Sequence, residues 1–246
     1  MKSIATAHFF LFIIIAVVII FSYWDSITNQ WTEVSSSDKI LPFLALSVAA
    51  FFSRVSSVKV SAKNYEAVND SLYIVSLYVG QFGLFALIIL SAVFPAELII
   101  RYKHIKEYGR YRVFRAIFSN LSILVVPGYI AYLVLQLAGS KNRLSYFAAF
   151  FAFMLLNKLL TAIGVSFLNE NYSFKEGFSI FKKSWRLDII FSLLIGYLIL
   201  ILYSVNISLM IVTIVLIFVL HYLLTRYMRK KNLASILEIL SQHRKQ

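Results

Sequence analysis

Long runs of apolar residues, separated by short polar segments, extend along nearly the whole chain. A helix that crosses the hydrocarbon core of a bilayer needs about 20 mainly apolar residues, so runs near this length predict membrane spans. We therefore predict an all-α protein, a polytopic transmembrane helix bundle of six or seven spans that forms a single integral membrane domain over residues 1–246. The predicted spans cover approximately residues 7–24, 40–60, 71–100, 116–137, 145–168, 188–204 and 207–225.

The first two runs decide the number of spans. We interpret the first run as a retained anchor and not a signal peptide, because no small-x-small cleavage site precedes Asp25. The second run is continuously apolar only over residues 40–52, since Arg54 and Lys59 follow closely. It crosses the bilayer if these two cations reach the headgroups by snorkelling; otherwise it re-enters the membrane or lies on its surface.

The later runs predict the helical connections. Residues 71–100 form a run longer than one span needs, so we expect this helix to tilt, to kink at Pro95 or to extend past the bilayer. A short polar turn at residues 138–144 joins the fourth and fifth runs and predicts a helical hairpin. The polar break at Ser204, Val205 and Asn206 divides the last apolar stretch and predicts a second hairpin.

Lys and Arg are concentrated in three segments, residues 101–115, 169–187 and the tail 226–246, which carry six, four and six of them. Cytoplasmic loops of membrane proteins carry an excess of these residues, so we place all three segments, and with them the C-terminus, in the cytoplasm. Seven spans then put the N-terminus outside, whereas six spans with a non-crossing second segment put it inside. Lys2 before the first span, and Asp25 and Glu33 after it, favour the inside.

Composition supports localisation in the cell (inner) membrane. The chain is 60% hydrophobic and 14% charged, and its mean hydropathy is +0.80, so much of its apolar surface must face lipid. A net charge of +13 is typical of a nucleic-acid-binding protein only where basic residues gather on a water-facing domain, and no soluble stretch here is long enough. We expect anionic lipid headgroups as partners, and no nucleic acid.

The chemistry of enzymes is sparse in this sequence. There are no cysteines, which excludes thiolate catalysis and cysteine-ligated zinc or iron–sulfur sites. The 11 carboxylates and four histidines include no H-E-x-x-H pair and no paired aspartates, and no P-loop occurs. We therefore expect no metal and no cofactor, and we lean towards a non-enzymatic protein.

Polar groups inside apolar runs are expensive in a membrane and are candidates for function. Lys158, beside Asn157, lies near the middle of the fifth run, and Glu97 lies near the cytoplasmic end of the third. These are the clearest opposite charges inside long apolar runs, so we predict that Glu97 and Lys158 pair. The pair serves either as an ion or proton relay or substrate site, or as a buried structural salt bridge.

Gln81 stands between Gly80 and Gly83 in the third run. An amide beside small residues is typical of close helix packing with an interhelical hydrogen bond, and this is the structure we expect there.

Residues 173–187 predict an amphipathic helix that begins with the S-x-x-E capping box Ser173-Phe174-Lys175-Glu176. Aromatic side chains recur on one face at spacings of three and four, and basic residues occupy the rest. The candidate lipid or partner contacts are Phe174, Phe178, Phe181, Trp185, Lys182, Lys183 and Arg186. We expect the helix to lie in the headgroup plane, where it either senses anionic lipid or docks a cytoplasmic partner, or only sets the angle of the next span.

The same helix ends in Lys183-Ser184-Trp185-Arg186-Leu187 before a span. In this it resembles the pattern in membrane domains associated with some glycerophosphodiester phosphodiesterases and related bacterial multi-pass proteins. The likeness is confined to residues 174–187, and no function for the chain follows from it.

Two functions fit these patterns. The first is a permease-like transport component that uses Lys158 and Glu97 inside the bundle, because interrupted, polar-bearing helices form such sites. The alternative is a membrane scaffold or assembly factor that recruits cytoplasmic or membrane protein partners, or anionic lipids, through its basic amphipathic helices. Transport predicts a water-accessible path to Lys158, whereas a scaffold predicts a dry bundle.

Overall fold

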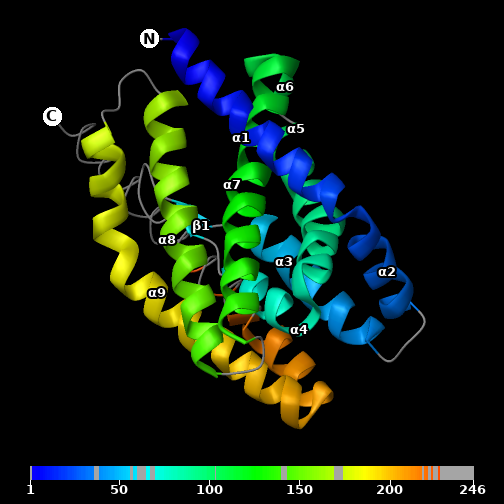
Figure 1. The fold of residues 1–246 in the computed structure, drawn as a ribbon. Coiled ribbons are helices and arrows are strands. Elements are labelled where there is room, and N and C mark those ends of the chain that lie inside the picture. Colours follow the sequence, from blue (N-terminus) through cyan, green and yellow to red (C-terminus); the bar gives the residue numbers. More distant parts are fainter. Residues whose placement is uncertain are drawn as a thin grey trace, which may run out of the picture.

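The computed structural model describes residues 2–35, 39–55, 58–59, 65–66, 70–102, 104–139, 143–168, 174–217, 219–220, 223 and 227. Nearly all of them are helical, so the all-α class is confirmed (Figure 1). The helices are α1 (Lys2–Ser22), α2 (Trp24–Ser35), α3 (Ile40–Val55), α4 (Asp70–Ile88), the π-helix η1 (Ile89–Val93), α5 (Phe94–Tyr102), α6 (Ile105–Tyr108), α7 (Arg110–Leu137), α8 (Arg143–Leu168), α9 (Phe174–Val205) and a further helix, Ile207–Ile217. Two short antiparallel strands, β1 (Val58–Lys59) and β2 (Tyr65–Glu66), lie between α3 and α4.

By length and composition alone, three stretches among the described residues could cross a membrane: Asp70–Tyr102, which contains a break at Gly80 and Gln81, Arg110–Leu137 and Leu144–Ile163. The pair Phe10–Ser22 and Trp24–Ser35, bent by 56°, makes a fourth if it counts as one span. This is fewer than the six or seven spans predicted, because three further apolar stretches of helix are only 10–17 residues long among the described residues: Ile40–Val55, Ser192–Val205 and Ile207–Ile217. The coarser prediction, a helical protein with membrane-crossing helices, stands.

Both predicted connections are present. The first predicted hairpin is formed by α7 and α8, which pack against each other; α7 ends at Leu137 and α8 begins at Arg143. The second break falls where α9 ends at Val205. The Asn206 side chain there accepts hydrogen bonds from the backbone N–H groups of Ser208 and Leu209, at 2.8 and 3.1 Å. Asn206 is therefore the N-cap of the next helix, which explains why the apolar stretch is interrupted there.

The predicted interfacial helix and the predicted span from residue 188 are continuous with each other, because Phe174–Val205 is one helix. No proline interrupts this stretch, and helical propensity carries the chain through the change from basic to apolar residues. The structure describes the backbone of residues 174–188 but not their side chains. The roles predicted for Phe174, Phe178, Phe181, Trp185, Lys182, Lys183 and Arg186 thus lie outside the described residues, as do those of the tail from residue 228 onward.

The third apolar run is not one tilted span but doubles back on itself. The backbone leaves the helical conformation at Gly80 (φ −125°, ψ 22°) and Gln81 (φ 54°, ψ −160°). The rings of Tyr73 and Phe85 lie 6.1 Å apart, whereas 12 residues of continuous helix would separate them by about 18 Å. We call this the α4 fold-back, with a first arm of residues 70–79 and a second arm of residues 82–102. The main break is at Gly80 and Gln81, which differs from all three predicted alternatives: a tilt, a kink at Pro95 or an extension past the bilayer.

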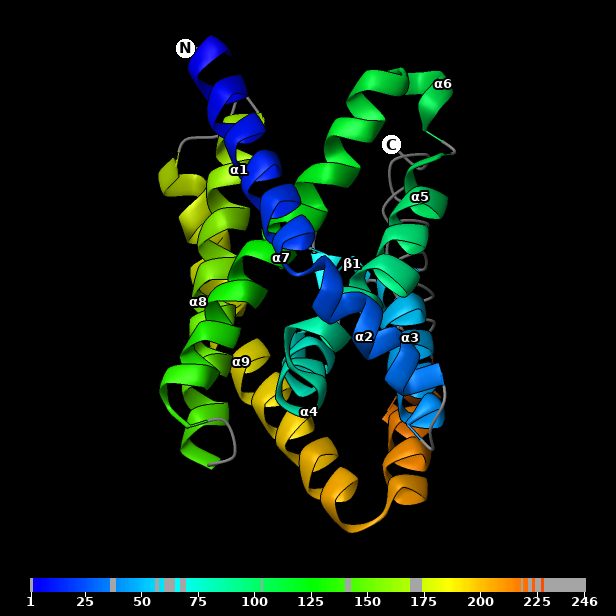
Figure 2. The ribbon, with the colours of Figure 1, turned by 45° about the vertical axis from the view of Figure 1, so that its right-hand side comes forward.

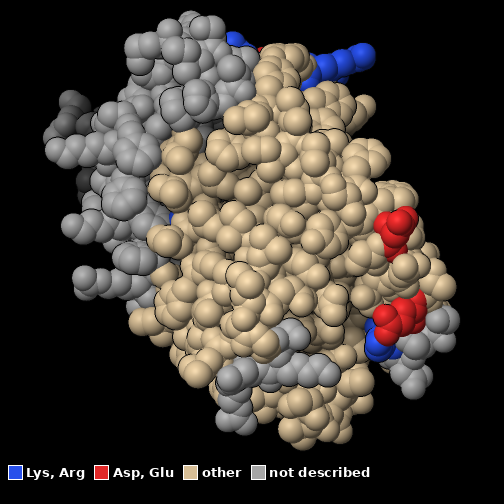
Figure 3. Space-filling view, viewed as in Figure 1, with Lys and Arg blue, Asp and Glu red and all other residues tan. Residues whose placement is uncertain are grey.

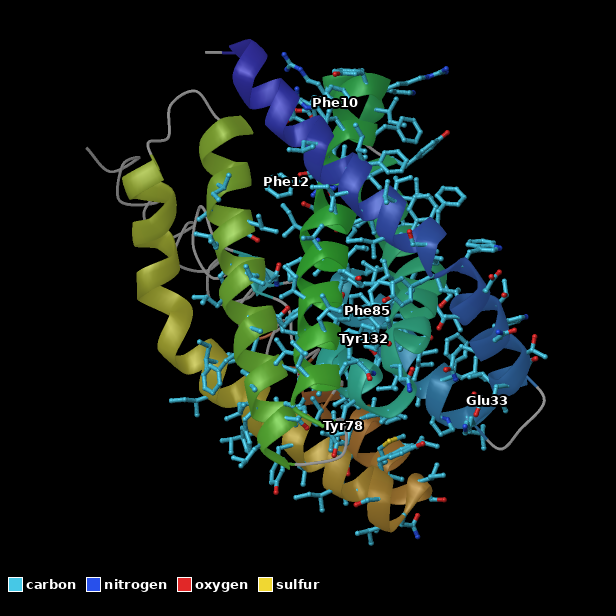
Figure 4. All side chains as sticks on the ribbon, viewed as in Figure 1. Phe10, Phe12, Glu33, Tyr78, Phe85 and Tyr132 are labelled. Carbon is cyan, nitrogen blue, oxygen red and sulfur yellow. The ribbon has the colours of Figure 1, made fainter. Side chains whose placement is uncertain are left out.

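The first arm occupies the centre of the molecule. Seven consecutive residues, Ser71 to Leu77, are buried, and α4 contacts α2, α3, α7, α8 and α9 (Figure 2). Close approach at glycines brings the helices together, because a Cβ on Gly128 of α7 would lie 2.3 Å from the Phe85 ring. Figure 4 shows Phe85 and Tyr132 in this interior, and Glu33 on α2 at the edge of the bundle.

The surface has the polarity expected of a membrane protein. On the face drawn in Figure 3, a broad area free of Lys, Arg, Asp and Glu covers most of the molecule, and charged residues appear only at its edges. Large apolar side chains of α1 are exposed, among them Phe10, Leu11, Ile14, Val18 and Phe21. An apolar patch of this kind is unusual on a water-soluble monomer and fits contact with lipid.

Candidate functional site

Glu97 is the centre of a buried ion-pair cluster, and its side chain is only 2% exposed. The Nε and Nη2 atoms of Arg54 both lie 2.5 Å from its Oε1. Its Oε2 accepts hydrogen bonds from Arg101 Nε at 2.7 Å and from Asn120 Nδ2 at 3.1 Å. We call Arg54, Glu97, Arg101 and Asn120 the Glu97 cluster. It joins three elements, because Arg54 comes from α3, Glu97 and Arg101 from α5, and Asn120 from α7.

The local sequence explains how α5 presents the carboxylate. Arg101 follows Glu97 by four residues, so both side chains lie on the same face of the helix. Ile99, between them, is exposed, whereas Glu97 is buried. A helix that buries its charge and exposes an isoleucine has the polarity of a membrane-embedded helix, whose polar residues face the bundle interior. The π-helix η1 just before α5 fixes this rotation, since a π-turn adds one residue to a helical turn.

The α4 fold-back brings a second acidic residue to the same region. Asp70 begins the first arm and accepts a hydrogen bond from Asn157 Nδ2 of α8 at 3.2 Å. Arg54 interacts electrostatically with both Asp70 and Glu97. In a straight helix, the 27 residues from Asp70 to Glu97 would hold these two acids about 40 Å apart, so the fold-back is what brings both within range of Arg54. The buried hydroxyl of Tyr73 also lies within electrostatic range of Arg54, and it has no hydrogen-bond partner among the described residues.

Glu97 is paired with cations, as predicted, but Lys158 is not the cation that it contacts. Glu97 is held by Arg54 and Arg101, which reach it because the fold-back packs α3 against the second arm. Asn157, predicted beside Lys158 as an intramembrane polar candidate, contacts Asp70. Lys158 itself is half-buried on α8, and its role stays a prediction.

The prediction for Gln81 and its glycines holds only in part. Close packing occurs at Gly83, where a Cβ would lie 2.9 Å from the backbone oxygen of Ser26 in α2. Gln81 lies at the tip of the α4 fold-back with an exposed side chain, and within the described part of the chain it forms no interhelical hydrogen bond. Its amide is at the break in the helix and not at a helix interface.

Sequence reasoning missed three members of the cluster as site residues. The sequence predicts Arg54 as a snorkelling residue at the end of a weak span, Arg101 as a topological signal, and Asn120 only as an amide that adds polarity to its span. The spacing of four between Glu97 and Arg101 was a usable signal. The hydrogen bond that Asn120 makes from α7 to Glu97 of α5 is the kind of interhelical bond expected of such an amide. No local pattern identifies Glu97 as the partner of Arg54 or Asn120, because those contacts depend on the fold.

The cluster can hold charge but has no evident metal chemistry. Across the described ranges, no three His, Asp or Glu side chains converge to bind a metal ion. Two guanidinium groups face one carboxylate within contact distance, so the contacts of Glu97 leave one positive charge in excess. Comparison of the chain with models of protein families, with curated proteins and with solved structures found no match.

Proposed function

We propose that the chain is a non-enzymatic, multi-pass protein of the cell inner membrane that acts as a permease-like transport component. The α4 fold-back and the Glu97 cluster would form the polar centre of its bundle. Two features support this: an interrupted helix in the core, and charged groups in the interior of an otherwise apolar bundle. Binding sites of secondary transporters form at such discontinuous helices, and intramembrane charges are commonly functional.

The observation that carries the proposal is the burial of Glu97 between two arginines. Desolvating three charged groups is expensive, and apolar residues of similar volume often stabilise a protein equally well or better. Retention of such a cluster at the meeting point of α3, α5 and α7 therefore favours a role in handling a polar solute over a purely structural one.

For topology, we propose six full crossings with both termini in the cytoplasm. The bent pair α1–α2, the second arm, α7, α8, α9 and the segment from Ile207 would cross, while α3 and the first arm form a shorter re-entrant pair. In support, the N-terminal end of α1 and helix α6 lie at one end of the molecule, and the turns after α7 and α9 at the other (Figure 1). The basic segment 101–115 is at the α6 end, which the positive-inside rule assigns to the cytoplasm.

The test uses single cysteines in this cysteine-free chain and a membrane-impermeant thiol reagent. Asn120→Cys probes the Glu97 cluster, and Phe118→Cys, two residues away on α7 and exposed on the apolar surface, is the matched control at the same depth. Transport predicts that water reaches Asn120→Cys, so it is labelled while Phe118→Cys is not.

Each other labelling pattern contradicts the proposal. If neither position reacts in a folded protein, the bundle is dry and the scaffold or assembly-factor hypothesis takes precedence. If both react, this part of α7 lies in water and the cluster is not intramembrane. Glu107→Cys and Ala138→Cys, exposed at opposite ends, confirm membrane insertion and test the topology, because each should be labelled from one side only.

A further inference from the structure

The two arginines of the Glu97 cluster have unused hydrogen-bonding capacity. A guanidinium carries five N–H donors. Arg101 donates only through Nε, and Arg54 through Nε and Nη2, which both reach the same oxygen of Glu97. The other N–H groups of these arginines have no partner in the part of the chain that the structure describes. Most of the donor surface of this arginine pair is therefore free for a ligand.

The electrostatics of the pair favour an anion. Among the described residues, Glu97 is the only carboxylate within contact distance of the two guanidinium groups, and it offsets one of their two charges. Asp70 acts on Arg54 from farther away and keeps its own negative charge, because its hydrogen-bond donor Asn157 is neutral. A positive charge in a low-dielectric surrounding attracts an anion far more strongly than the same charge in water. The basic segment that follows Arg101 adds to the positive potential at this end.

Exposure shows from which side a ligand would arrive. The Glu97 side chain is 2% exposed, whereas that of Arg54 is 24% exposed and that of Arg101 is 33% exposed. The carboxylate is thus buried more deeply than the two arginine side chains that contact it, and each of these side chains keeps part of its surface exposed. Two adjacent guanidinium forks match the geometry of phosphate oxygens, which bind such groups in a bidentate manner.

We propose that Arg54 and Arg101, held together by Glu97, bind a phosphate group, carried either by an anionic phospholipid or by a phosphorylated solute. The inference rests on the proposed transport function, since it names the chemical class that the polar centre takes. Arg54 and Arg101 are the binding residues, and Glu97 and Asn120 position them.

The experiment measures thermal unfolding of the full chain in nanodiscs. Neutral phosphatidylcholine nanodiscs titrated with inorganic phosphate report a soluble ligand, and nanodiscs with added phosphatidylglycerol report a lipid headgroup. We expect either ligand to raise Tm. Arg101→Gln should weaken the response at least about tenfold, because a charge-assisted bidentate contact is lost. Arg101→Lys should restore only part of it, because lysine keeps the charge but not the fork.

The matched control is Arg112→Gln, which removes one charge from the exposed start of α7. Its response should equal that of the wild type. No Tm shift with either ligand, or an equal loss in Arg112→Gln, overturns the proposal. Failure of this proposal can be told apart from failure of the transport proposal. If Asn120→Cys is labelled but phosphate does not raise Tm, only the phosphate site is rejected. If phosphate raises Tm but Asn120→Cys is not labelled, only transport is rejected.

Discussion

Replacing Glu97 by glutamine removes the charge that holds the Glu97 cluster together while keeping the volume of the side chain. The carboxylate accepts from Arg54 at 2.5 Å, Arg101 at 2.7 Å and Asn120 at 3.1 Å. Glutamine has one oxygen in place of two, and its amide N–H groups would face a guanidinium. Both arginines then lose the carboxylate that they contact, and only Arg54 keeps a more distant counter-charge, that of Asp70.

The size of the effect follows from burial. Removing one partner of a fully buried ion pair destabilises proteins by about 3–5 kcal/mol. Arg54 and Arg101 are 24% and 33% exposed, so part of this loss is recovered by solvation, and we expect Glu97→Gln to lower the free energy of unfolding by about 3 kcal/mol. The control is Glu33→Gln, which breaks the Glu33–Lys39 ion pair, whose two side chains are each 50% exposed. That change should lower it by about 0.5 kcal/mol or less.

Reversible unfolding of the full chain in mixed micelles measures both variants under the same conditions. A double-mutant cycle adds Arg54→Met to Glu97→Gln, and the double variant should lose less than the sum of the single losses, because the arginine no longer lacks a partner. A Glu97→Gln effect as small as that of Glu33→Gln would refute the claim that this carboxylate is closed off inside the bundle.

Three further changes test the fold in the same unfolding assay. Gln81→Gly should stabilise the chain by up to about 1 kcal/mol and Gln81→Val should destabilise it, because φ 54° favours glycine; a stabilising valine would contradict the break. Gly128→Ala should destabilise by about 1–3 kcal/mol, since the new Cβ would lie 2.3 Å from the Phe85 ring, and Phe85→Leu in the same chain should restore part of the loss. Deletion of Leu90 should convert η1 into an α-helix and turn α5 by about 100°, which moves Glu97 away from its partners. The free energy of unfolding should then fall by as much as in Glu97→Gln, while the helical circular dichroism stays unchanged. A deletion without effect would show that η1 does not set the position of Glu97.

Local polarity predicted the connections of this fold correctly. Asn206 interrupts an apolar stretch, and its side chain caps the following helix, so the break was visible in the sequence. The connection between α7 and α8 was visible for the same reason. These features depend on neighbours in the sequence, and hydrophobic pattern reports them directly.

The α4 fold-back could not be predicted in this way. Both arms are apolar, and Gly80 with Gln81 fits close packing as well as a break, so hydropathy is the same for a straight and a folded helix. The partners of Glu97 depend on that choice, because Arg54 reaches it only when α3 packs against the second arm. Charge inside apolar runs thus identified Glu97 and Asn157 as polar interior residues, but not the residues that contact them.

The spacing between the two arms tests the fold-back, and with it the candidate site, most directly. Spin labels at Asp70→Cys and Ser91→Cys, in this cysteine-free chain, measure it by pulsed electron paramagnetic resonance. A continuous helix would hold these positions about 32 Å apart. Arms packed against each other place their axes about 8–10 Å apart, so we predict a distance distribution well below 32 Å. A distribution centred near 32 Å would contradict the fold-back and separate Asp70 from the Glu97 cluster.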